Sequence, residues 1–190
     1  MSKLTLTILG LCLTLFTFGQ GKNQKKWDRV VSEMTKANQG DTISARSKAI
    51  LEWSDFKMPP ESSKDLHVHP ELTFGVFTKK VNVWTGTITV ESYGGIRRDL
   101  SWVKPEYKSQ QLLDYLQLKY NISHYFAKKS EKEINSGKIN AGNVNKVNGI
   151  IEKHLDARDK ALNEFDTESN FGSNAEALNK WKEKLRSNEI

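Results

Sequence analysis

The sequence predicts an α+β protein: a small antiparallel sheet in the N-terminal half, followed by three helices. The chain has 190 residues, which is enough for one domain with a substantial hydrophobic core. Residues 50–93 are rich in Val, Thr, Ile and aromatic residues, whereas the chain after Pro105 is helical in composition. Strands first and helices afterwards is the order typical of α+β domains.

Two stretches carry the strand pattern, ELTFGVFTKK at 71–80 and VNVWTGTITVES at 81–92. Both contain runs in which apolar and polar residues alternate. Trp84, Ile88 and Val90 share a parity, so on a strand they would lie on one face. Segments rich in turn residues, MPPESSKD and SYGGIRRD, separate the pieces. We therefore expect an antiparallel sheet between about residues 50 and 100.

Helices are expected near 106–135, 143–163 and 174–188, because turn residues interrupt the helical pattern between these ranges. In the first helix, the apolar residues at helical spacing are expected to face the core; they are Leu112, Leu113 and Leu116. The predicted core also contains large aromatic side chains, namely Trp53, Phe56, Trp84, Trp102 and Trp181.

Residues 1–19 have the features of a cleaved secretory signal peptide. Lys3 is followed by an almost unbroken apolar run from Leu4 to Phe18, which is shorter than the roughly 20 residues of a membrane-spanning helix. The only cysteine, Cys12, lies in this run, so the mature chain would have no disulfide. We expect a secreted or periplasmic bacterial protein with no stable membrane anchor after cleavage.

The rest of the chain is divided into an N-terminal helical segment, 20–47, and a single domain, 48–190. The segment has an apolar stripe at helical spacing, made of Trp27, Val30, Val31 and Met34. The formal net charge is +6, but basic and acidic residues alternate in stretches such as EKHLDARDK. This mixing is typical of a solvated helix face, so nucleic acid is not an expected partner.

Several short motifs occur in the order found in one bacterial family. They are W-S-D-F at 53–56, S-W-V at 101–103, a helix with L-L at 112–113, and F-D-T-E-S-N-F-G at 165–172, followed by Trp181. In this order they resemble the secreted zinc-dependent-protease family known as domain of unknown function 922. The resemblance implies a zincin-like arrangement of the sheet and helices in the domain 48–190.

The zinc signature of that family is not kept. The family helix carries L-L-x-H-E-Q-x-H-F-D-I; its two histidines and a third in the later motif hold zinc, and its glutamate activates water. The four corresponding positions here are Tyr115, Leu116, Lys119 and Phe171. A protonated phenol, an ammonium and a phenyl ring are not zinc ligands, and leucine cannot accept a proton. The resemblance therefore implies a vestigial site at these four positions, with no metal, no cofactor and no catalytic residue.

If the family scaffold is kept, Tyr115, Lys119 and Phe171 should converge in space. Tyr115 and Lys119 are four residues apart and share a helix face. The Lys119 ammonium is expected beside the Tyr115 hydroxyl or an acid of the later motif, Asp166 or Glu168. Phe171 is expected to fill the space that the metal site has lost. The two acids are otherwise expected to cap or support the turn.

Histidines outside this helix provide an alternative site. His67 and His69 are two residues apart, so a strand would place both imidazoles on one side. His124 lies beyond the vestigial positions on the same predicted helix. One alternative is therefore an active hydrolase with a rearranged metal site that uses His67, His69 or His124.

The sequence thus predicts a secreted, catalytically inactive relative of a zinc metallopeptidase that binds a peptide or another envelope protein. Two alternatives stay open: the active hydrolase with a rearranged metal site, and a purely structural envelope protein.

Overall fold

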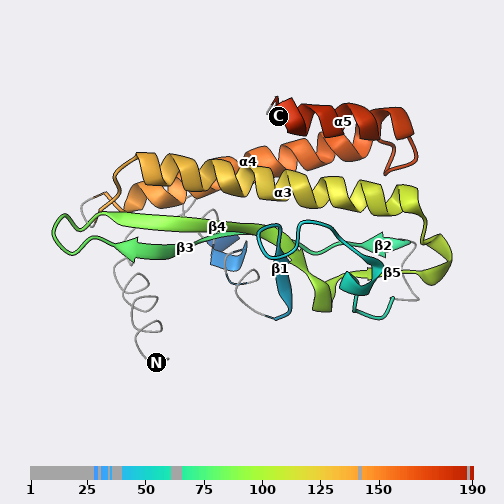
Figure 1. Ribbon diagram of the computed structural model, residues 1–190, viewed down its shortest axis with the longest axis horizontal. Coiled ribbons are helices and arrows are strands. Elements are labelled where there is room, and N and C mark those ends of the chain that lie inside the picture. The colour runs from blue at the N-terminus through green and yellow to red at the C-terminus, as the bar shows by residue number, and fades with distance from the viewer. Residues whose placement is uncertain are drawn as a thin grey trace.

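The structure is a computed structural model that describes residues 28–29, 31–33, 35, 40–60, 66–140, 143–187 and 189–190. The fold is α+β, as the sequence predicts (Figure 1). Residues 1–19, predicted to be a signal peptide, and three residues of the N-terminal stripe, Trp27, Val30 and Met34, lie outside the described residues. Within the described part, no helix is both long and apolar enough to cross a membrane.

The main sheet has three antiparallel strands in the order β1-β4-β3. These are β1 (Thr42–Ser44), β3 (Leu72–Val81) and β4 (Ile88–Arg97). A second, two-stranded sheet pairs β2 (Val68–His69) with β5 (Trp102–Val103). β1 pairs with the end of β4, so residues 42–44 join the sheet although the sequence analysis assigned them to the N-terminal helical segment.

The prediction that Trp84 lies buried on a strand face with Ile88 and Val90 is wrong. β3 and β4 form a long hairpin, and Trp84 lies in the turn between them with 94% of its surface exposed. The Asn82 side chain accepts hydrogen bonds from the amides of Trp84 and Thr85, a local turn that competes with strand pairing. Strand pairing therefore stops at Val81 and begins again at Ile88, although the apolar composition continues through Val83 and Trp84.

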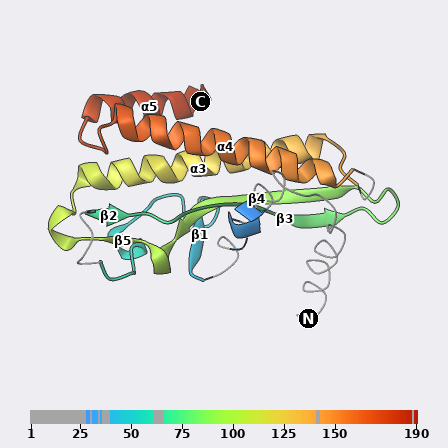
Figure 2. The same cartoon turned by 180° about the vertical axis from the view of Figure 1, so that it is seen from behind.

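The helices that follow the sheet lie on one side of the hairpin, and the first of them lies directly along it (Figures 1 and 2). They are α3 (Gln110–Ser136), α4 (Asn145–Glu168) and α5 (Ala175–Ser187). α3 lies along β4, α4 packs on α3, and α5 lies against the end of α3 and α4 that is remote from the hairpin turn. α3 begins at Gln110, after a short 3-10 turn at Pro105–Tyr107, because Ser109 caps it by accepting a hydrogen bond from the Leu112 amide.

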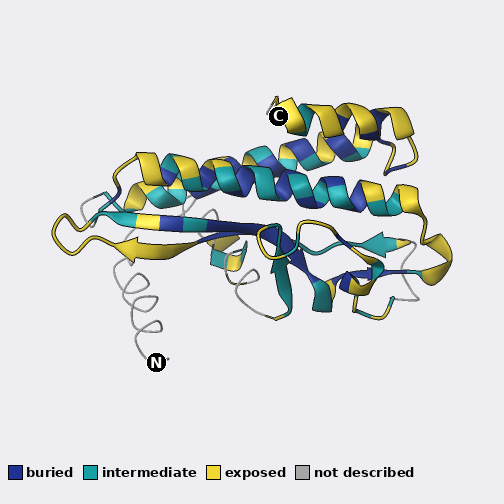
Figure 3. Cartoon of the chain, in the orientation of Figure 1, coloured by how far each residue is buried: buried dark blue, intermediate teal, exposed yellow. Residues whose placement is uncertain are grey.

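The hydrophobic core lies between the hairpin and α3 and continues between the helices (Figure 3). Among the residues predicted for the core, Leu116, Trp102 and Trp181 are fully buried. Trp53, Phe56, Leu112 and Leu113 are half-buried and pack against the core from its rim. The fully buried residues with the largest side chains include Phe74, Tyr120, Ile122 and Phe165.

α3 also satisfies the edge of β4 that β1 leaves open. Asn135 accepts a hydrogen bond from the Val90 amide and donates one to the Val90 carbonyl, at 2.8 and 3.0 Å. Glu131 accepts from the amide and the hydroxyl of Ser92. The helix can come this close because Gly94 has no side chain: a β-carbon there would lie 2.7 Å from the α3 backbone at His124.

Candidate functional site

Two helices bring together a half-buried cluster of three polar side chains: Tyr115 and Lys119 of α3, and Asp166 of α4. We call it the Tyr-Lys-Asp cluster. Lys119 Nζ lies 2.7 and 2.9 Å from the two carboxylate oxygens of Asp166. The Tyr115 hydroxyl donates to Asp166 Oδ1 at 2.6 Å, and Lys119 Nζ donates to the Tyr115 oxygen at 3.3 Å. Of the three partners expected for the Lys119 ammonium, the structure shows the Tyr115 hydroxyl and Asp166, but not Glu168.

Aromatic stacking holds the cluster in place. The Tyr115 ring stacks on Phe165, with the ring centres 5.3 Å apart, and Phe165 meets Trp181 of α5 edge-on at 5.4 Å. Trp181 donates its indole N–H to Glu168 at 3.0 Å. Glu168 therefore ties α4 to α5 and takes no part in the Tyr-Lys-Asp cluster. The aromatic series fixes the three helices relative to one another.

The motif at 165–172 lies against α3, but Phe171 does not fill the cluster. Its side chain is 71% exposed, so the expectation that it plugs the site is wrong. Gly172 takes the place against Tyr115 instead: a β-carbon there would lie 2.7 Å from Tyr115 Cγ. Three successive residues, Asn170 to Gly172, have positive φ, which turns the Phe171 side chain away from α3.

The resemblance drawn from the sequence assigns Leu116 to the position of the family's catalytic glutamate. Leu116 is 1% exposed and belongs to the hydrophobic core cluster. A carboxylate at this position would lose its hydration without a compensating partner in the core. The orientation of α3 in this chain therefore suits leucine at 116 and disfavours the glutamate of a zinc protease.

The electrostatics of the cluster favour an ion pair over acid-base chemistry. Burial and the hydrogen bond to Asp166 raise the pKa of the Tyr115 hydroxyl far above that of a free phenol. The tyrosine thus stays protonated and acts as a donor. The Lys119 ammonium is bonded to both oxygens of Asp166, so its protons are directed to the carboxylate. Each polar group of the cluster is satisfied by another, which makes the cluster a closed unit.

The structure does not bring the alternative histidines together as a metal site. His67 stacks on Tyr107 with the ring centres 3.7 Å apart, and His69 lies 3.3 Å from Glu71. The backbone of His124 lies against Gly94 of β4; burial first, and then nearby cations, lower the pKa of its side chain. Across the described ranges, which include all three histidines, no group of three or more His, Cys, Asp or Glu side chains could hold a metal ion.

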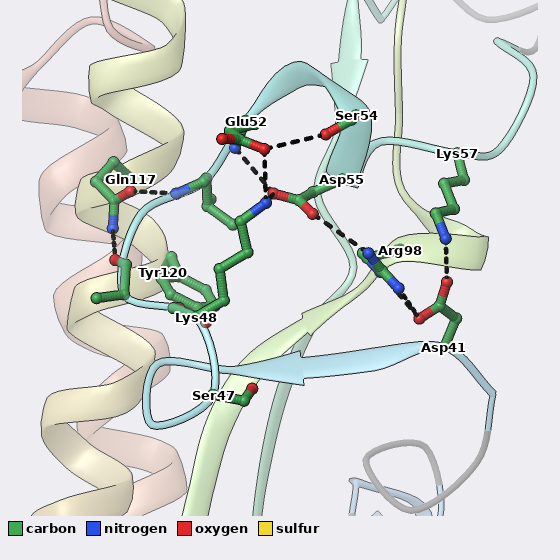
Figure 4. Close-up of polar contacts among 12 residues, drawn as sticks. Asp41, Ser47, Lys48, Glu52, Ser54, Asp55, Lys57, Arg98, Gln117 and Tyr120 are labelled. Atoms are coloured by element: carbon green, nitrogen blue, oxygen red, sulfur yellow. Dashed lines mark hydrogen bonds and ion pairs between the residues drawn. The ribbon is translucent and has the colours of Figure 1, made fainter.

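A second polar network, which the sequence analysis missed, lies around the W-S-D-F motif (Figure 4). Asp55 is fully buried and pairs with Lys48 at 2.7 Å and more distantly with Arg98. It also accepts from the Glu52 amide, which closes the 3-10 turn Trp53–Asp55. The network continues through Arg98 to Asp41.

This network is connected to α3. Gln117 accepts from the Leu51 amide and donates to the Ala49 carbonyl, and the Tyr120 hydroxyl donates to the Lys48 carbonyl. Residues 48–51, just before the W-S-D-F motif, therefore fasten this segment to the helix. The only signal in the sequence was the motif itself, because the partners of Asp55 lie before and after it in the chain.

We compared the chain with protein-family models, with curated proteins and with solved structures, and none of the three comparisons gave a match. The resemblance to domain of unknown function 922 thus stays a prediction from the motifs and their order.

Proposed function

We propose that the chain is an exported, non-catalytic relative of a zinc metallopeptidase and acts by binding a peptide or another protein of the bacterial envelope. The observation that carries this proposal is the Lys119–Asp166 ion pair with its Tyr115 hydrogen bond. In the proposed ancestry, the Lys119 ammonium occupies the position of the lost metal ion. The Asp166 carboxylate of α4 neutralises its charge. An ammonium has no lone pair to offer a metal or a substrate proton.

The surface beside the cluster is a suitable place for a partner. Phe171 presents an exposed aromatic ring there and is held in a left-handed backbone conformation, with φ of 51°. Its amide donates to the Asp166 carbonyl at 2.9 Å, so the same residue supplies the carboxylate of the cluster and anchors the turn. Bulky residues with positive φ are uncommon and are found preferentially at binding and catalytic sites.

The catalytic half of the proposal is tested by the metal content and the peptidase activity of the exported protein. We expect no stoichiometric zinc, no cleavage of an unfolded protein substrate, and a melting temperature that a chelator leaves unchanged. Stoichiometric zinc, or cleavage that a chelator abolishes, would contradict it.

The binding half is tested by photo-crosslinking in cells of a bacterium that makes the protein. A photoreactive amino acid replaces Phe171 in one strain and Lys160, an exposed residue of α4, in the control strain. We expect a discrete adduct with an envelope protein or peptide from position 171 and none from position 160. Equal labelling from both positions, or from neither, would argue against a partner at this surface.

A further inference from the structure

The turn of the β3–β4 hairpin displays apolar side chains to solvent. Val83 is 88% and Trp84 94% exposed, and Figure 3 shows the turn as an exposed projection at one end of the domain. Val81, at the end of β3, is also exposed. We call Val81, Val83 and Trp84 the hairpin tip. These exposed side chains contribute nothing to the core of this chain. Only contact with another molecule would bury them.

The turn is built to hold these side chains outward. Asn82 Oδ1 accepts from the amides of Trp84 and Thr85 at 2.9 and 3.2 Å. The Asn82 carbonyl accepts from the Gly86 amide at 2.8 Å, and Gly86 has the positive φ that closes the turn. Because these three amides are bonded within the turn, they stay paired when the hairpin tip enters a less polar medium.

Basic residues outnumber acidic ones near the hairpin tip. The chain has 23 acidic residues, yet none lies in residues 72–90 or 134–151. These two segments meet where the Ile88 amide donates to the Ile139 carbonyl at 2.7 Å. They carry four exposed lysines, which are Lys79, Lys80, Lys138 and Lys146. Lys79 pairs with Glu91, and the other three leave this end of the domain basic.

We propose that the hairpin tip docks reversibly on a membrane surface that contains anionic lipids, with Trp84 at the level of the headgroups and the lysines against their charges. Tryptophan is enriched at membrane interfaces, and basic residues near the surface add about fivefold each to binding. The tip is convex and projects from the sheet, so its shape fits a deformable surface such as a lipid bilayer. The complementary charge decides between lipid and a neutral apolar partner.

This inference goes beyond the proposed function, because it depends on the hairpin tip and not on the Tyr-Lys-Asp cluster or on Phe171. Docking of this kind is peripheral: one tryptophan and two valines cannot replace a membrane-spanning helix. Loss of catalysis and docking on lipid can therefore be tested separately.

The experiment measures co-sedimentation of the full chain with phosphatidylcholine vesicles, with and without phosphatidylglycerol. The first variant combines Val83→Ser with Trp84→Ser, and the second combines Lys80→Gln with Lys138→Gln. Ile50→Ser is the control at a different exposed apolar residue. All chains share the same N-terminus, so any contribution from it is the same in each. Since the changed side chains are exposed, unchanged circular dichroism and melting temperature establish that each variant is folded.

We expect binding to the anionic vesicles that decreases with salt, falls about tenfold or more in the tip variant and falls in the lysine variant, with no change in Ile50→Ser. Quenching of tryptophan fluorescence by brominated acyl chains should disappear with Trp84. No binding by the parent chain, equal binding by the tip variant, or equal binding to neutral vesicles would each overturn the proposal. If the tip variant instead loses a protein partner and vesicles are not bound, the hairpin tip is a protein-docking element and the lipid proposal is wrong.

Discussion

Gly172 lies directly against the ring of Tyr115, so close that a β-carbon at position 172 would stand 2.7 Å from Tyr115 Cγ. Its φ of 88° is in addition one that side chains rarely adopt. We expect Gly172→Ala to lower the free energy of unfolding by about 2–4 kcal/mol, the sum of backbone strain and overpacking. Urea denaturation of the two proteins measures this difference.

Gly86→Ala is the matched control for that change. Gly86 has a similar φ of 66° in the hairpin turn, but nothing lies within 4 Å of the position of its β-carbon. Only the backbone strain of about 1–2 kcal/mol should be seen there. Equal losses at the two glycines would mean that the contact with Tyr115 is absent in solution.

The ion pair of Lys119 and Asp166 should show energetic coupling. Lys119→Met and Asp166→Asn are each expected to cost about 1–3 kcal/mol, because the side chains are only 13% and 18% exposed and each leaves its partner uncompensated. The double variant should be less destabilised than the two losses added together, by about 1–2 kcal/mol.

The Lys160–Glu164 pair on the exposed side of α4 provides a reference cycle, since its side chains are 80% and 52% exposed. Its coupling should not exceed about 0.5 kcal/mol. If urea denaturation gives additive losses for Lys119 and Asp166, the two groups do not interact in solution.

A zinc site should be easier to build with Asp166 than with position 171. Combining Tyr115→His with Lys119→His places two imidazoles four residues apart on α3, next to the Asp166 carboxylate. We expect this variant to bind zinc and to melt at a higher temperature with the metal than with a chelator. Calorimetry and thermal melts measure the two effects.

Adding Asp166→Asn to the same two changes is the control and should weaken zinc binding at least tenfold. Leu116 is left unchanged because a glutamate would be buried there. Zinc affinity that does not depend on Asp166 would show that the ligands lie elsewhere.

The Glu131 carboxylate makes the free energy of unfolding depend on pH in the acid range. Burial acts to raise the pKa of its carboxyl, but hydrogen bonds from Ser92, Lys128 and Arg46 outweigh it and lower the pKa to about 2. The folded pKa is below the ordinary value of 4.5, so the stabilisation is fully present above about pH 4.5 and is lost as pH falls towards 2.

Glu131→Gln should therefore cost about 2 kcal/mol at pH 7 and progressively less below about pH 4.5. Thermal melts of both proteins across this range give the comparison. A stability difference that stays constant down to pH 2 would mean that Glu131 does not titrate in the way its contacts indicate.

The helices could be predicted from the sequence because their signals are local. Apolar spacing and the break residues placed all three within a few residues of α3, α4 and α5. The hairpin turn was mispredicted because Val83 and Trp84 continue the strand composition. Asn82 and Gly86 were the available signals, since both are typical turn residues and stand four apart.

The candidate site was predictable only in part. The spacing of four residues predicted that Tyr115 and Lys119 share a helix face. The motif at 165–172 pointed to Asp166 as a partner of Lys119. The direction of Phe171 was not predictable, because it depends on three successive residues with positive φ, two of which are not glycine. The partners of Asp55 were missed for another reason: Lys48 and Arg98 are brought to it by the tertiary fold and by no local pattern.

The hydrogen bonds from α3 to the edge of β4 have a consequence for the order in which the chain acquires its structure. Val90 and Ser92 depend on side chains that are 45 and 39 residues further along the chain. During synthesis or translocation, the hairpin emerges well before these side chains do. Until α3 has formed, the unpaired edge of β4 can pair with a strand of another chain. The protein is thus most vulnerable to aggregation as a nascent chain that ends between β4 and the last turns of α3, and a holding chaperone would be needed there rather than after release.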